Sequence, residues 1–382
     1  MTDSFGPQYI VKVHDPSIGM RGFLVVDNIL LGPGKGGIRM TADVSEEEVR
    51  RLARAMTWKN ALAGIPFGGA KAGMVWEGGT PEKKKQFVQS FARLLKPFTP
   101  RLYIAGPDVG SGEREMQWFV EATGNFRSAT GKPANLCMKV FGKPGEKCGL
   151  PHEFGSTGFG VAQATRVAAE VLGIPLKNAT VAIHGFGNVG SFTYTILSEM
   201  GARVIALADS RVALISPNGF DHAQLKKIID TRGNLGQYKG ARRVSTEKFW
   251  AKPVDILIPA SVTDVVNDSN YRTIQAKIIV EAGNIPMREH IEEKLWRNGI
   301  LTVPDFVANA GGVISSYAEY RGYNPKRMFD LVERKITKST RLVLEQSIKT
   351  KKNPREVAML IAKKIIEKAT IKKWEQKGRS VR

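Results

Sequence analysis

Two lysines of the chain lie in glycine-rich settings that suit the binding of a small anion. Lys35 lies in the segment Gly32 to Arg39, and Lys71 follows Phe67-Gly68-Gly69-Ala70. Glycines remove side-chain bulk and let a ligand come close to the backbone. A solvated lysine in a flexible loop is the simpler interpretation, but the apolar residues on both sides of Lys71 argue against it.

Lys59 extends the apolar face of a helix that follows Ser45. The apolar positions before it on this face are Val49, Leu52, Ala53 and Met56, and the same stripe continues through Asn60 and Ala63. A lysine on a buried stripe is costly unless a counter-charge meets it. The partner could be a structural carboxylate or an anionic ligand, and the pattern leaves both open.

Three semi-buried lysines near one site suit a small dianion and a catalytic amine. Two ammonium groups could hold two carboxylates, and the third, with a pKa lowered by its cationic neighbours, could act chemically. Asp108 lies in the turn Gly106-Pro107-Asp108-Val109. It could simply form the turn, or exchange protons beside an activated lysine.

A second set of residues has the pattern of a phosphate cradle. The segment Gly185-Phe186-Gly187-Asn188-Val189-Gly190 joins an apolar run at 180–184 to a helical pattern at 188–200. The glycines permit a tight turn, close approach of a pyrophosphate, and close packing of helix on strand. The helix N-terminus supplies unpaired N–H groups. The sequence therefore predicts a dinucleotide site.

The acidic residue that usually binds the adenosine ribose is expected at Asp209, directly after the apolar run 203–208. A carboxylate there should repel a 2′-phosphate. Ser210 and Arg211 follow it, however, and could bind such a phosphate. The sequence slightly favours NAD and leaves use of NADP open.

The elements that must position these residues predict an α/β fold in two domains. Residues 9–13 and 22–31 have strand patterns, and Ser45 with Glu48 forms a capping box before a helix. From about residue 155, helices at 156–172 and 188–200 alternate with short apolar strands, which is typical of a parallel sheet with helices on both faces. These strands are expected at 180–184, 203–208, 254–258, 277–281 and 301–303.

The predicted domains are 1–150, for substrate and oligomerisation, and 151–334, a Rossmann-type dinucleotide-binding domain. Helices at about 335–382 are expected to pack back on the first domain. The segment from Lys132 to Pro151 has the composition of a connector or surface excursion.

Composition narrows the class of protein. The 382 residues contain no apolar run of the length of a membrane span and begin without a signal-peptide pattern. The two cysteines, Cys137 and Cys148, indicate no metal site and fit a reducing cytoplasm. A cytoplasmic location is therefore expected.

The net charge of +21 is unusual and is partly concentrated near the C-terminus. Nucleic-acid binding is one interpretation. A solvated cationic surface is the favoured one, because no RNA-binding aromatic motif or zinc finger accompanies the charge.

Seven segments in order resemble the glutamate/leucine/phenylalanine/valine dehydrogenase family over roughly residues 10 to 320. The segments are Gly32 to Arg39, Thr57 to Ala61, Phe67 to Lys71, Gly106 to Val109, Ser156 to Val161, Gly185 to Gly190, and Val307 to Val313.

The resemblance implies a role for each matching residue. Lys71 matches the catalytic lysine and Asp108 the acid/base aspartate. Lys59 matches the lysine that holds the α-carboxylate, with Met56 lining that pocket. The resemblance and the nucleotide pattern together imply cofactor contacts at Thr157, Ser210, Ala260, Asn284 and Asn309 in addition to the residues from Gly185 to Gly190 and Asp209.

The resemblance also implies the substrate. Lys35 matches the lysine that meets the γ-carboxylate of glutamate, and Ser316 matches the serine that assists it. An apolar amino acid would leave Lys35 buried and unpaired. The expected activity is reversible oxidative deamination of L-glutamate to 2-oxoglutarate and ammonium by a homohexamer. The alternatives are a leucine, valine or phenylalanine dehydrogenase, or a catalytically silent regulatory homologue.

Overall fold

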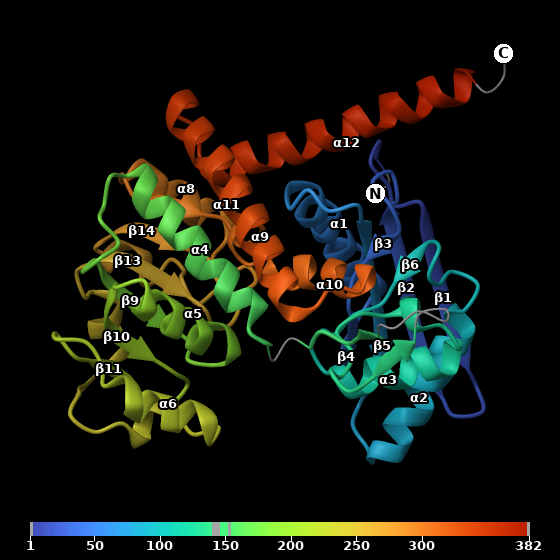
Figure 1. Ribbon diagram of the computed structural model, residues 1–382, viewed down its shortest axis with the longest axis horizontal. Coiled ribbons are helices and arrows are strands. Elements are labelled where there is room, and N and C mark those ends of the chain that lie inside the picture. Colours follow the sequence, from blue (N-terminus) through green and yellow to red (C-terminus); the bar gives the residue numbers. More distant parts are fainter. Residues whose placement is uncertain (1–2, 140–145, 152–153, 380–382) are drawn as a thin grey trace. The chain divides into compact units, whose positions relative to one another are not determined.

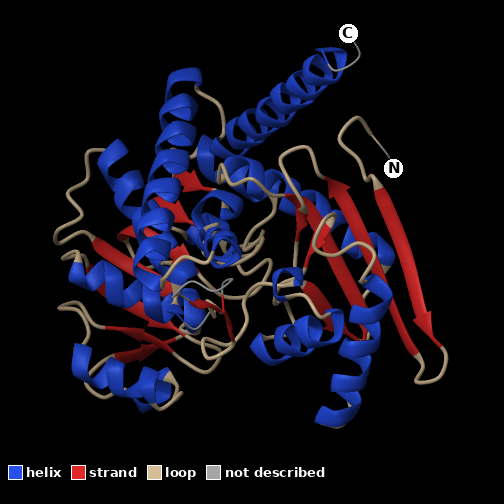
Figure 2. Ribbon diagram, turned by 45° about the vertical axis from the view of Figure 1, so that its right-hand side comes forward, coloured by secondary structure: helices blue, strands red, loops and turns tan. Residues whose placement is uncertain are grey.

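The computed structural model describes residues 3–139, 146–151 and 154–379 (Figure 1). The chain forms two compact units. Unit 1 comprises Met1–Phe154, Val313–Leu331 and Ile361–Arg382, and unit 2 comprises Gly155–Gly312 and Val332–Leu360. Each unit contains a β-sheet with helices packed against it (Figure 2).

The division differs from the predicted domains in the C-terminal third of the chain. Residues Val313–Leu331 group with unit 1, and Val332–Leu360 group with unit 2. The physical reason is that two long helices, α11 (Pro325–Thr350) and α12 (Pro354–Arg379), each supply residues to both units. A boundary within a continuous helix leaves no loop signal in the sequence.

The sheet of unit 1 follows the order β1-β2-β5-β3-β6, with β4 also paired to β5. Its strands are β1 (Tyr9–Asp15), β2 (Met20–Asn28), β3 (Gly34–Lys35), β4 (Ile38–Thr41), β5 (Gly68–Val75) and β6 (Tyr103–Ile104). Strand β2 runs antiparallel to both β1 and β5, whereas β3 and β4 run parallel to β5. Lys35 and Lys71 therefore lie on neighbouring strands near the sheet's centre.

Four helices of unit 1 support this sheet. They are α1 (Glu46–Leu62), α2 (Pro81–Leu95), α3 (Glu113–Thr123) and α10 (Gly311–Arg321), together with the short helix η1 (Phe126–Ser128). The Ser45 side chain caps α1 by accepting a hydrogen bond from the Glu48 N–H at 3.2 Å. The Glu48 carboxylate accepts a hydrogen bond from Arg39 Nη1 at 2.5 Å. It therefore makes a tertiary contact in place of the bond to the Ser45 N–H that the predicted capping box requires.

The sheet of unit 2 has the order β12-β11-β10-β9-β13-β14-β15. The strands are β9 (Thr180–His184), β10 (Arg203–Ala208), β11 (Ala213–Ile215), β12 (Arg242–Val244), β13 (Val254–Pro259), β14 (Ala276–Val280) and β15 (Leu301–Val303). Five neighbouring strands of this sheet are parallel, as the alternating pattern predicts, and they are β10, β9, β13, β14 and β15. Strands β11 and β12 extend the sheet as an antiparallel pair that the sequence did not indicate.

The helices of unit 2 connect these strands. They are α4 (Ser156–Val171), α5 (Asn188–Glu199), α6 (His222–Asp230), α7 (Thr246–Trp250), α8 (Glu289–Arg297) and α9 (Asp305–Ala308), with the short helices η3 (Leu235–Gln237) and η4 (Tyr271–Thr273). Apolar strand residues such as Ile183, Leu207 and Ile279 are buried at the centre of this unit. Within the ranges that the structure describes, no helix is long and apolar enough to cross a membrane.

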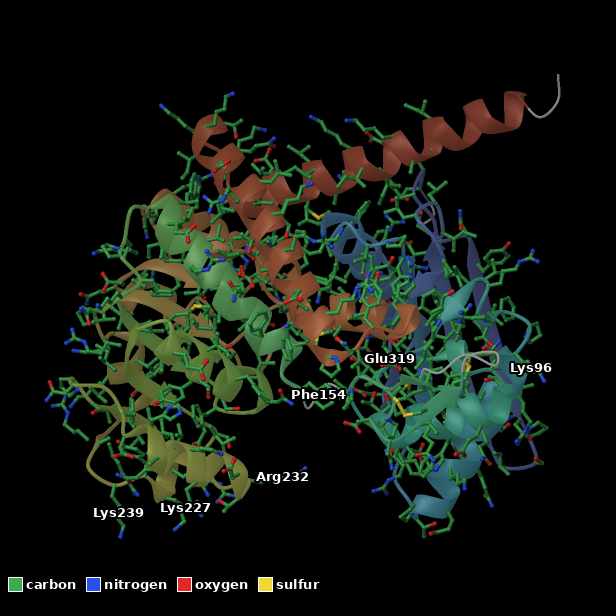
Figure 3. The ribbon with its side chains drawn as sticks, in the orientation of Figure 1. Lys96, Phe154, Lys227, Arg232, Lys239 and Glu319 are labelled. Atoms are coloured by element: carbon green, nitrogen blue, oxygen red, sulfur yellow. A yellow bond between two sulfur atoms is a disulfide. The ribbon has the colours of Figure 1, made fainter. Side chains whose placement is uncertain are left out.

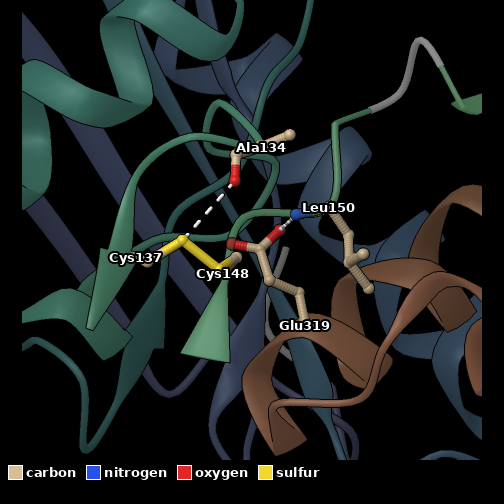
Figure 4. Close-up of a disulfide and its surroundings, with 5 residues drawn as sticks. All are labelled: Ala134, Cys137, Cys148, Leu150 and Glu319. Carbon is tan, nitrogen blue, oxygen red and sulfur yellow. Dashed lines mark hydrogen bonds between the residues drawn. A yellow bond between two sulfur atoms is a disulfide. The ribbon is translucent and has the colours of Figure 1, made fainter. Parts of the chain in front are cut away.

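The segment predicted as a connector contains a small hairpin. Strands β7 (Cys137–Lys139) and β8 (Glu146–Cys148) pair antiparallel, and their register places Cys137 opposite Cys148. The two residues form a disulfide (Figure 4). The sequence favoured a reducing environment for these cysteines, whereas the hairpin brings them together as a bonded pair.

Candidate active site

Lys35 lies at the centre of a buried group of charges in unit 1. Its side chain is almost completely enclosed, and Nζ donates a hydrogen bond to the carbonyl oxygen of Ala105 at 3.0 Å. A Cβ on Gly106 would lie 2.2 Å from this Nζ, so only glycine leaves room for the ammonium group there. The glycine-rich segments predicted around Lys35 and Asp108 therefore meet each other in the fold.

Lys71 and Asp108 form a direct contact. The Lys71 Nζ lies 2.6 Å from Asp108 Oδ2, and the two side chains are 8% and 13% exposed. Arg39 donates a second hydrogen bond from Nε to the same oxygen at 3.2 Å. A carboxylate thus lies between two cations, and an enclosed amine lies within proton-transfer distance of it.

The backbone around this pair is packed too closely for larger residues. A Cβ on Gly36 would lie 1.7 Å from the Ala70 carbonyl oxygen, and one on Gly37 would lie 2.4 Å from the Pro107 carbonyl oxygen. These glycines let the Lys35 segment lie directly against both β5 and the Asp108 turn. Ser111 holds that turn, because its hydroxyl donates to the Ile38 carbonyl oxygen at 2.5 Å.

Burial sets the protonation of these groups, and their neighbours modify it. Burial is the main cause that lowers the pKa of Lys35 to about 7. The Glu319 carboxylate opposes that decrease, whereas the ammonium groups of Lys71 and Lys132 add to it. Burial also lowers the pKa of Lys71, and Asp108 limits the decrease. For Asp108 itself, burial favours the neutral acid, but Lys71 and Arg39 outweigh it and hold the pKa below its ordinary value.

Glu319 links three parts of unit 1. It lies on α10, one turn after Ser316, and is labelled in Figure 3. Its carboxylate pairs with the Lys132 ammonium and accepts hydrogen bonds from the N–H groups of Gly131 at 2.7 Å and Leu150 at 3.0 Å (Figure 4). Ser316, the predicted substrate-binding serine, is buried on the same helix.

Helix α1 carries the predicted residues Lys59 and Met56, which are half-buried rather than fully buried. Val49, Ala53 and Asn60 of the predicted stripe are buried, and so is Thr57, which was not part of it. Asn60 donates from Nδ2 to the Gly68 carbonyl oxygen at 2.6 Å, which fixes α1 against the strand that bears Lys71. The Thr57 hydroxyl donates to Asp27 Oδ2 at 2.5 Å, so this polar side chain is also satisfied on the buried face.

The predicted phosphate cradle in unit 2 has the backbone that a dinucleotide needs. Gly185 adopts a positive φ of 103°, and a Cβ on Gly190 would lie 1.8 Å from the Gly185 carbonyl oxygen. Nothing lies within 4 Å of a Cβ built on Gly187, so this residue leaves open space in front of the N-terminus of α5. No side chain caps that helix end. The first N–H groups of α5, from Asn188 and Val189 onward, therefore fit a pyrophosphate.

The other predicted cofactor residues surround the ends of neighbouring strands. The Ala260 N–H donates to the His184 carbonyl oxygen at 2.7 Å, directly before the cradle. Asn309 donates from Nδ2 to the Gly283 carbonyl oxygen at 2.9 Å and to Asn284 Oδ1 at 3.2 Å. Its buried Oδ1 atom has no hydrogen-bond partner, which fits an amide donor from a bound ligand.

Thr157 lies in the first turn of α4, beside the segment that follows Asn309. A Cβ on Gly311 would lie 2.1 Å from the Ser156 carbonyl oxygen. The two glycine-containing segments around Thr157 and Gly311 therefore approach each other closely within unit 2.

Asp209 and Ser210 occupy the turn between β10 and β11, and Phe186 packs against Tyr194 with ring centroids 5.9 Å apart. Ser210 is exposed, as a cofactor contact there would require. Asp209, however, is half-buried, and its carboxylate is engaged by backbone N–H groups of the chain itself.

Sequence reasoning missed the two residues that complete the charge group, Lys132 and Glu319. Both are at most 1% exposed. The only sequence signal was the position of Glu319, three residues after Ser316, which places both on one face of a helix. Lys132 was treated as part of a surface connector. Its partner Glu319 lies far away in the sequence, 188 positions after Gly131, so the pairing leaves no local pattern.

Known proteins match this chain over most of its length. Residues 7–125 match the family described as Glu/Leu/Phe/Val dehydrogenase, dimerisation domain, and residues 149–374 match the family described as Glutamate/Leucine/Phenylalanine/Valine dehydrogenase. The glutamate dehydrogenase of Aeropyrum pernix is 34% identical over 369 residues, which cover 92% of this chain and 86% of that protein.

Two further relatives carry different cofactor names. The NADP-specific glutamate dehydrogenase of Saccharolobus shibatae is 35% identical over 77% of this chain and 69% of its own length. The NAD-specific glutamate dehydrogenase of Clostridioides difficile is 35% identical over 81% of this chain and 75% of its own length. The solved hetero-hexameric glutamate dehydrogenase from Thermus thermophilus, in its Leu-bound form, superposes with a TM-score of 0.82 at 25% identity, covering 95% of this chain and 89% of that one.

Proposed function

The chain belongs to the glutamate/leucine/phenylalanine/valine dehydrogenase family, and we propose that it catalyses the reversible, NAD(P)-dependent oxidative deamination of L-glutamate to 2-oxoglutarate and ammonia. The observation that carries this proposal is the enclosed pair of Lys71 and Asp108, 2.6 Å apart, in the same charge group as the buried Lys35. An amine and a carboxylate perform the proton transfers, and a separate ammonium group remains for the substrate.

The proton transfers follow from the charges of this pair. When bound, NAD(P)+ accepts the hydride that leaves Cα of glutamate. Asp108, held ionised by Lys71 and Arg39, takes a proton from the substrate amino group through Oδ2 so that an imine forms. The lowered pKa of Lys71 lets its ammonium group lose a proton to solvent, and the neutral Nζ then takes a proton from the water that adds to the imine carbon. Asp108 returns its proton to the nitrogen. The C–N bond then breaks as the new hydroxyl group gives its proton to solvent, so the carbonyl of 2-oxoglutarate forms and ammonia leaves, and Lys71 remains protonated for the next cycle.

Substrate binding is assigned to four residues. Lys35 pairs with the γ-carboxylate, assisted by the Ser316 hydroxyl, and Lys59 pairs with the α-carboxylate beside Met56. The enclosure of Lys35 supports this assignment, because a buried ammonium group favours a partner of opposite charge. The group of Lys35, Lys71 and Lys132 has two carboxylate neighbours, Asp108 and Glu319, and so favours an anionic substrate over a neutral one.

The nucleotide would be held in unit 2. The N–H groups at the start of α5 would bind the pyrophosphate. The residues Thr157, Ala260, Asn284 and Asn309 would bind its nicotinamide half. The orphan Oδ1 of Asn309 supports this, since a carboxamide N–H would satisfy it.

The assembly and location of the protein belong to the same proposal. We expect a homohexamer, because the first family match is described as a dimerisation domain and a solved structure of the same fold is hexameric. A cytoplasmic location is expected because the substrate and both nicotinamide cofactors are available there.

The test is absorbance at 340 nm with purified protein, L-glutamate, leucine, valine or phenylalanine, and NAD or NADP. Reduction of the cofactor is expected with glutamate, and Lys71→Ala should abolish it. Arg114→Ala, which removes a cation elsewhere in unit 1, is the matched control and should retain activity. Preference for leucine would transfer the proposal to the branched-chain enzymes. The absence of reduction with every pair would indicate a silent homologue and contradict the proposal.

A further inference from the structure

The carboxylate of Asp209, which follows β10, accepts hydrogen bonds from the protein's own backbone. Oδ1 of Asp209 accepts hydrogen bonds from the N–H groups of Arg211 at 2.8 Å and Val212 at 2.9 Å. Its Oδ2 accepts one from the N–H of Leu235 at 2.7 Å. The carboxylate therefore fixes the β10–β11 turn against η3. Three N–H dipoles offset its charge, so it is poorly suited to accept both hydroxyls of an adenosine ribose or to repel a phosphate.

A basic hollow lies at the same edge of the sheet. It is lined by Arg242, Arg243, Val244, Ser245 and Lys248. Val244 pairs with Ala213, and Ala213 pairs with Ala208, the residue before Asp209. The chain leaves β12 at the edge where it leaves β10, two strands away, which is about 10 Å.

Helix α7 connects this hollow to the phosphate cradle. Its Trp250 is buried and stacks on His184, with ring centroids 4.6 Å apart. His184 directly precedes Gly185, the first glycine of the cradle. Lys248 lies on the exposed face of the same helix, so it is carried by an element that packs against the nucleotide site.

The cations around this hollow have no acidic partners. Within the part of the chain that the structure describes, Arg211, Arg242, Arg243 and Lys248 make no salt bridge, and all four are exposed. Arg243 donates from Nη2 to the Gly236 carbonyl oxygen at 2.8 Å, which holds it beside η3 and hence beside the residue that bonds Asp209. Further exposed cations, Lys227 and Lys239, lie on α6 and the segments that follow it (Figure 3).

We propose that the hollow lined by Arg242, Arg243, Ser245 and Lys248, together with Arg211, binds the 2′-phosphate of NADP, so that this chain takes NADP in preference to NAD. The inference rests on the proposed dehydrogenase function and specifies its cofactor. Guanidinium groups match the oxygens of a phosphate with paired hydrogen bonds, and the adjacent ammonium adds charge. It reverses the slight preference for NAD that Asp209 indicated in the sequence, because that carboxylate is turned to the backbone.

The test compares two fragments that differ only in the 2′-phosphate. Isothermal titration calorimetry at fixed ionic strength should give a dissociation constant for 2′,5′-ADP roughly tenfold or more below that for 5′-AMP. The double variant Arg243→Ala/Lys248→Ala should lose most of this ratio while retaining the affinity for 5′-AMP. Lys277→Ala is the matched control, since it removes an exposed cation of unit 2 that pairs with Asp255 on the other half of the sheet.

The possible outcomes distinguish failure of this inference from failure of the proposed function. Equal affinity for the two fragments, or a ratio that the double variant keeps, would overturn the inference and leave the proposed reaction intact. An equal loss in Lys277→Ala would show that only the general positive charge of the unit matters, which also overturns it. If neither fragment binds, the dinucleotide site itself is wrong, and the proposed function fails with it.

Discussion

At the scale of single residues, the candidate site consists of enclosed cations that contact enclosed carboxylates. Asp108 lies between Lys71 and Arg39, and Glu319 pairs with Lys132. Among the described residues, Lys35 donates its hydrogen bond to a backbone carbonyl, that of Ala105, and not to a carboxylate. Buried ammonium groups are strongly destabilising unless compensated, so the carboxylates are as necessary to the site as the cations.

The enclosed Lys35 should determine which amino acid the protein accepts. Lys35→Leu removes the partner of a γ-carboxylate, and kcat/KM for glutamate should fall by about a hundredfold or more. The same change offers an apolar surface, so activity with leucine or norvaline should rise. Steady-state kinetics with both substrate classes measures this, and the affinity for the cofactor should stay unchanged as a control. Unimpaired use of glutamate would disprove the assignment of Lys35.

Glu319 should set the pH range in which Lys35 is charged. The pKa of Lys35 lies at about 7, so below pH 7 the ammonium form is present and KM for glutamate should be independent of pH. Above pH 7 the free protein must take up a proton to bind the carboxylate, and KM should rise. Glu319→Gln removes the carboxylate that raises this pKa, so the rise should begin at lower pH.

The measurement for this prediction is KM against pH for the native chain and for Glu319→Gln. Glu121→Gln, an exposed carboxylate of α3, is the control and should leave the profile in place. A thermal melt of each variant separates loss of folding from a shifted profile. Identical profiles for the native chain and Glu319→Gln would show that Glu319 acts on structure alone.

The sequence was informative where close packing depends on a local pattern. The packing around Lys35, Lys71 and Asp108 could be predicted, because each lies in a glycine-rich segment. Lys132 and Glu319 could not, because their pairing depends on α10 packing against a distant part of the chain. The half-buried position of Lys59 was not predicted either, because the buried face of α1 includes Thr57, whose hydrogen bond to Asp27 is a tertiary contact without a local pattern.

At the scale of elements, apolar runs predicted the parallel strands of unit 2. Strands β9, β10 and β15 lie at the predicted bounds. Strand β12 did not give a pattern, because two of its three residues are exposed arginines, and β11 is a buried run of only three residues that follows directly on the turn after β10. The β7–β8 hairpin was hidden by a composition typical of loops, and its pairing is set by the register that joins Cys137 to Cys148.

The cradle before α5 permits a matched pair of substitutions. Gly190→Ala would place a Cβ 1.8 Å from the Gly185 carbonyl oxygen, so α5 must move away from β9, and the melting temperature should fall by several degrees, as expected for about 1–3 kcal/mol of overpacking. Gly187→Ala meets nothing within 4 Å and should fold normally, yet it fills space before the helix N-terminus and should weaken dinucleotide binding. Thermal melts and titration of the cofactor distinguish the two. Equal stability of both variants would contradict this reading of the turn.

At the scale of the whole molecule, an arginine at the start of α12 contacts three carboxylates from earlier parts of unit 2. Arg355 donates from Nε to Glu292 at 2.6 Å, and from Nη2 to Asp305 at 2.9 Å and Glu281 at 3.3 Å. Glu281 and Glu292 are fully buried, and burial raises the pKa of both, that of Glu292 to about 7. Three carboxylates thus share one guanidinium group.

Removal of this arginine should destabilise unit 2 strongly. Arg355→Met leaves buried carboxylates without a cation and should lower the free energy of unfolding by about 3–5 kcal/mol. Because the folded-state pKa values of the two glutamates are raised, the folded protein binds more protons than the unfolded chain, and stability should decrease as pH rises from about 4.5 towards 7. Chemical denaturation across this range measures both effects. Arg341→Met, at an exposed salt bridge of α11, should change little.

The Glu319 contact also has a consequence for biosynthesis. Unit 1 includes Met1–Phe154 and Val313–Leu331, so all of Gly155–Gly312 is translated between Lys132 and Glu319. At the usual speed of a ribosome, roughly 10 to 30 s pass between the emergence of Lys132 and that of its carboxylate partner. During this interval the nascent first segment carries Lys35, Lys71 and Lys132 without Glu319, so the pocket reaches its final charge balance only near the end of translation.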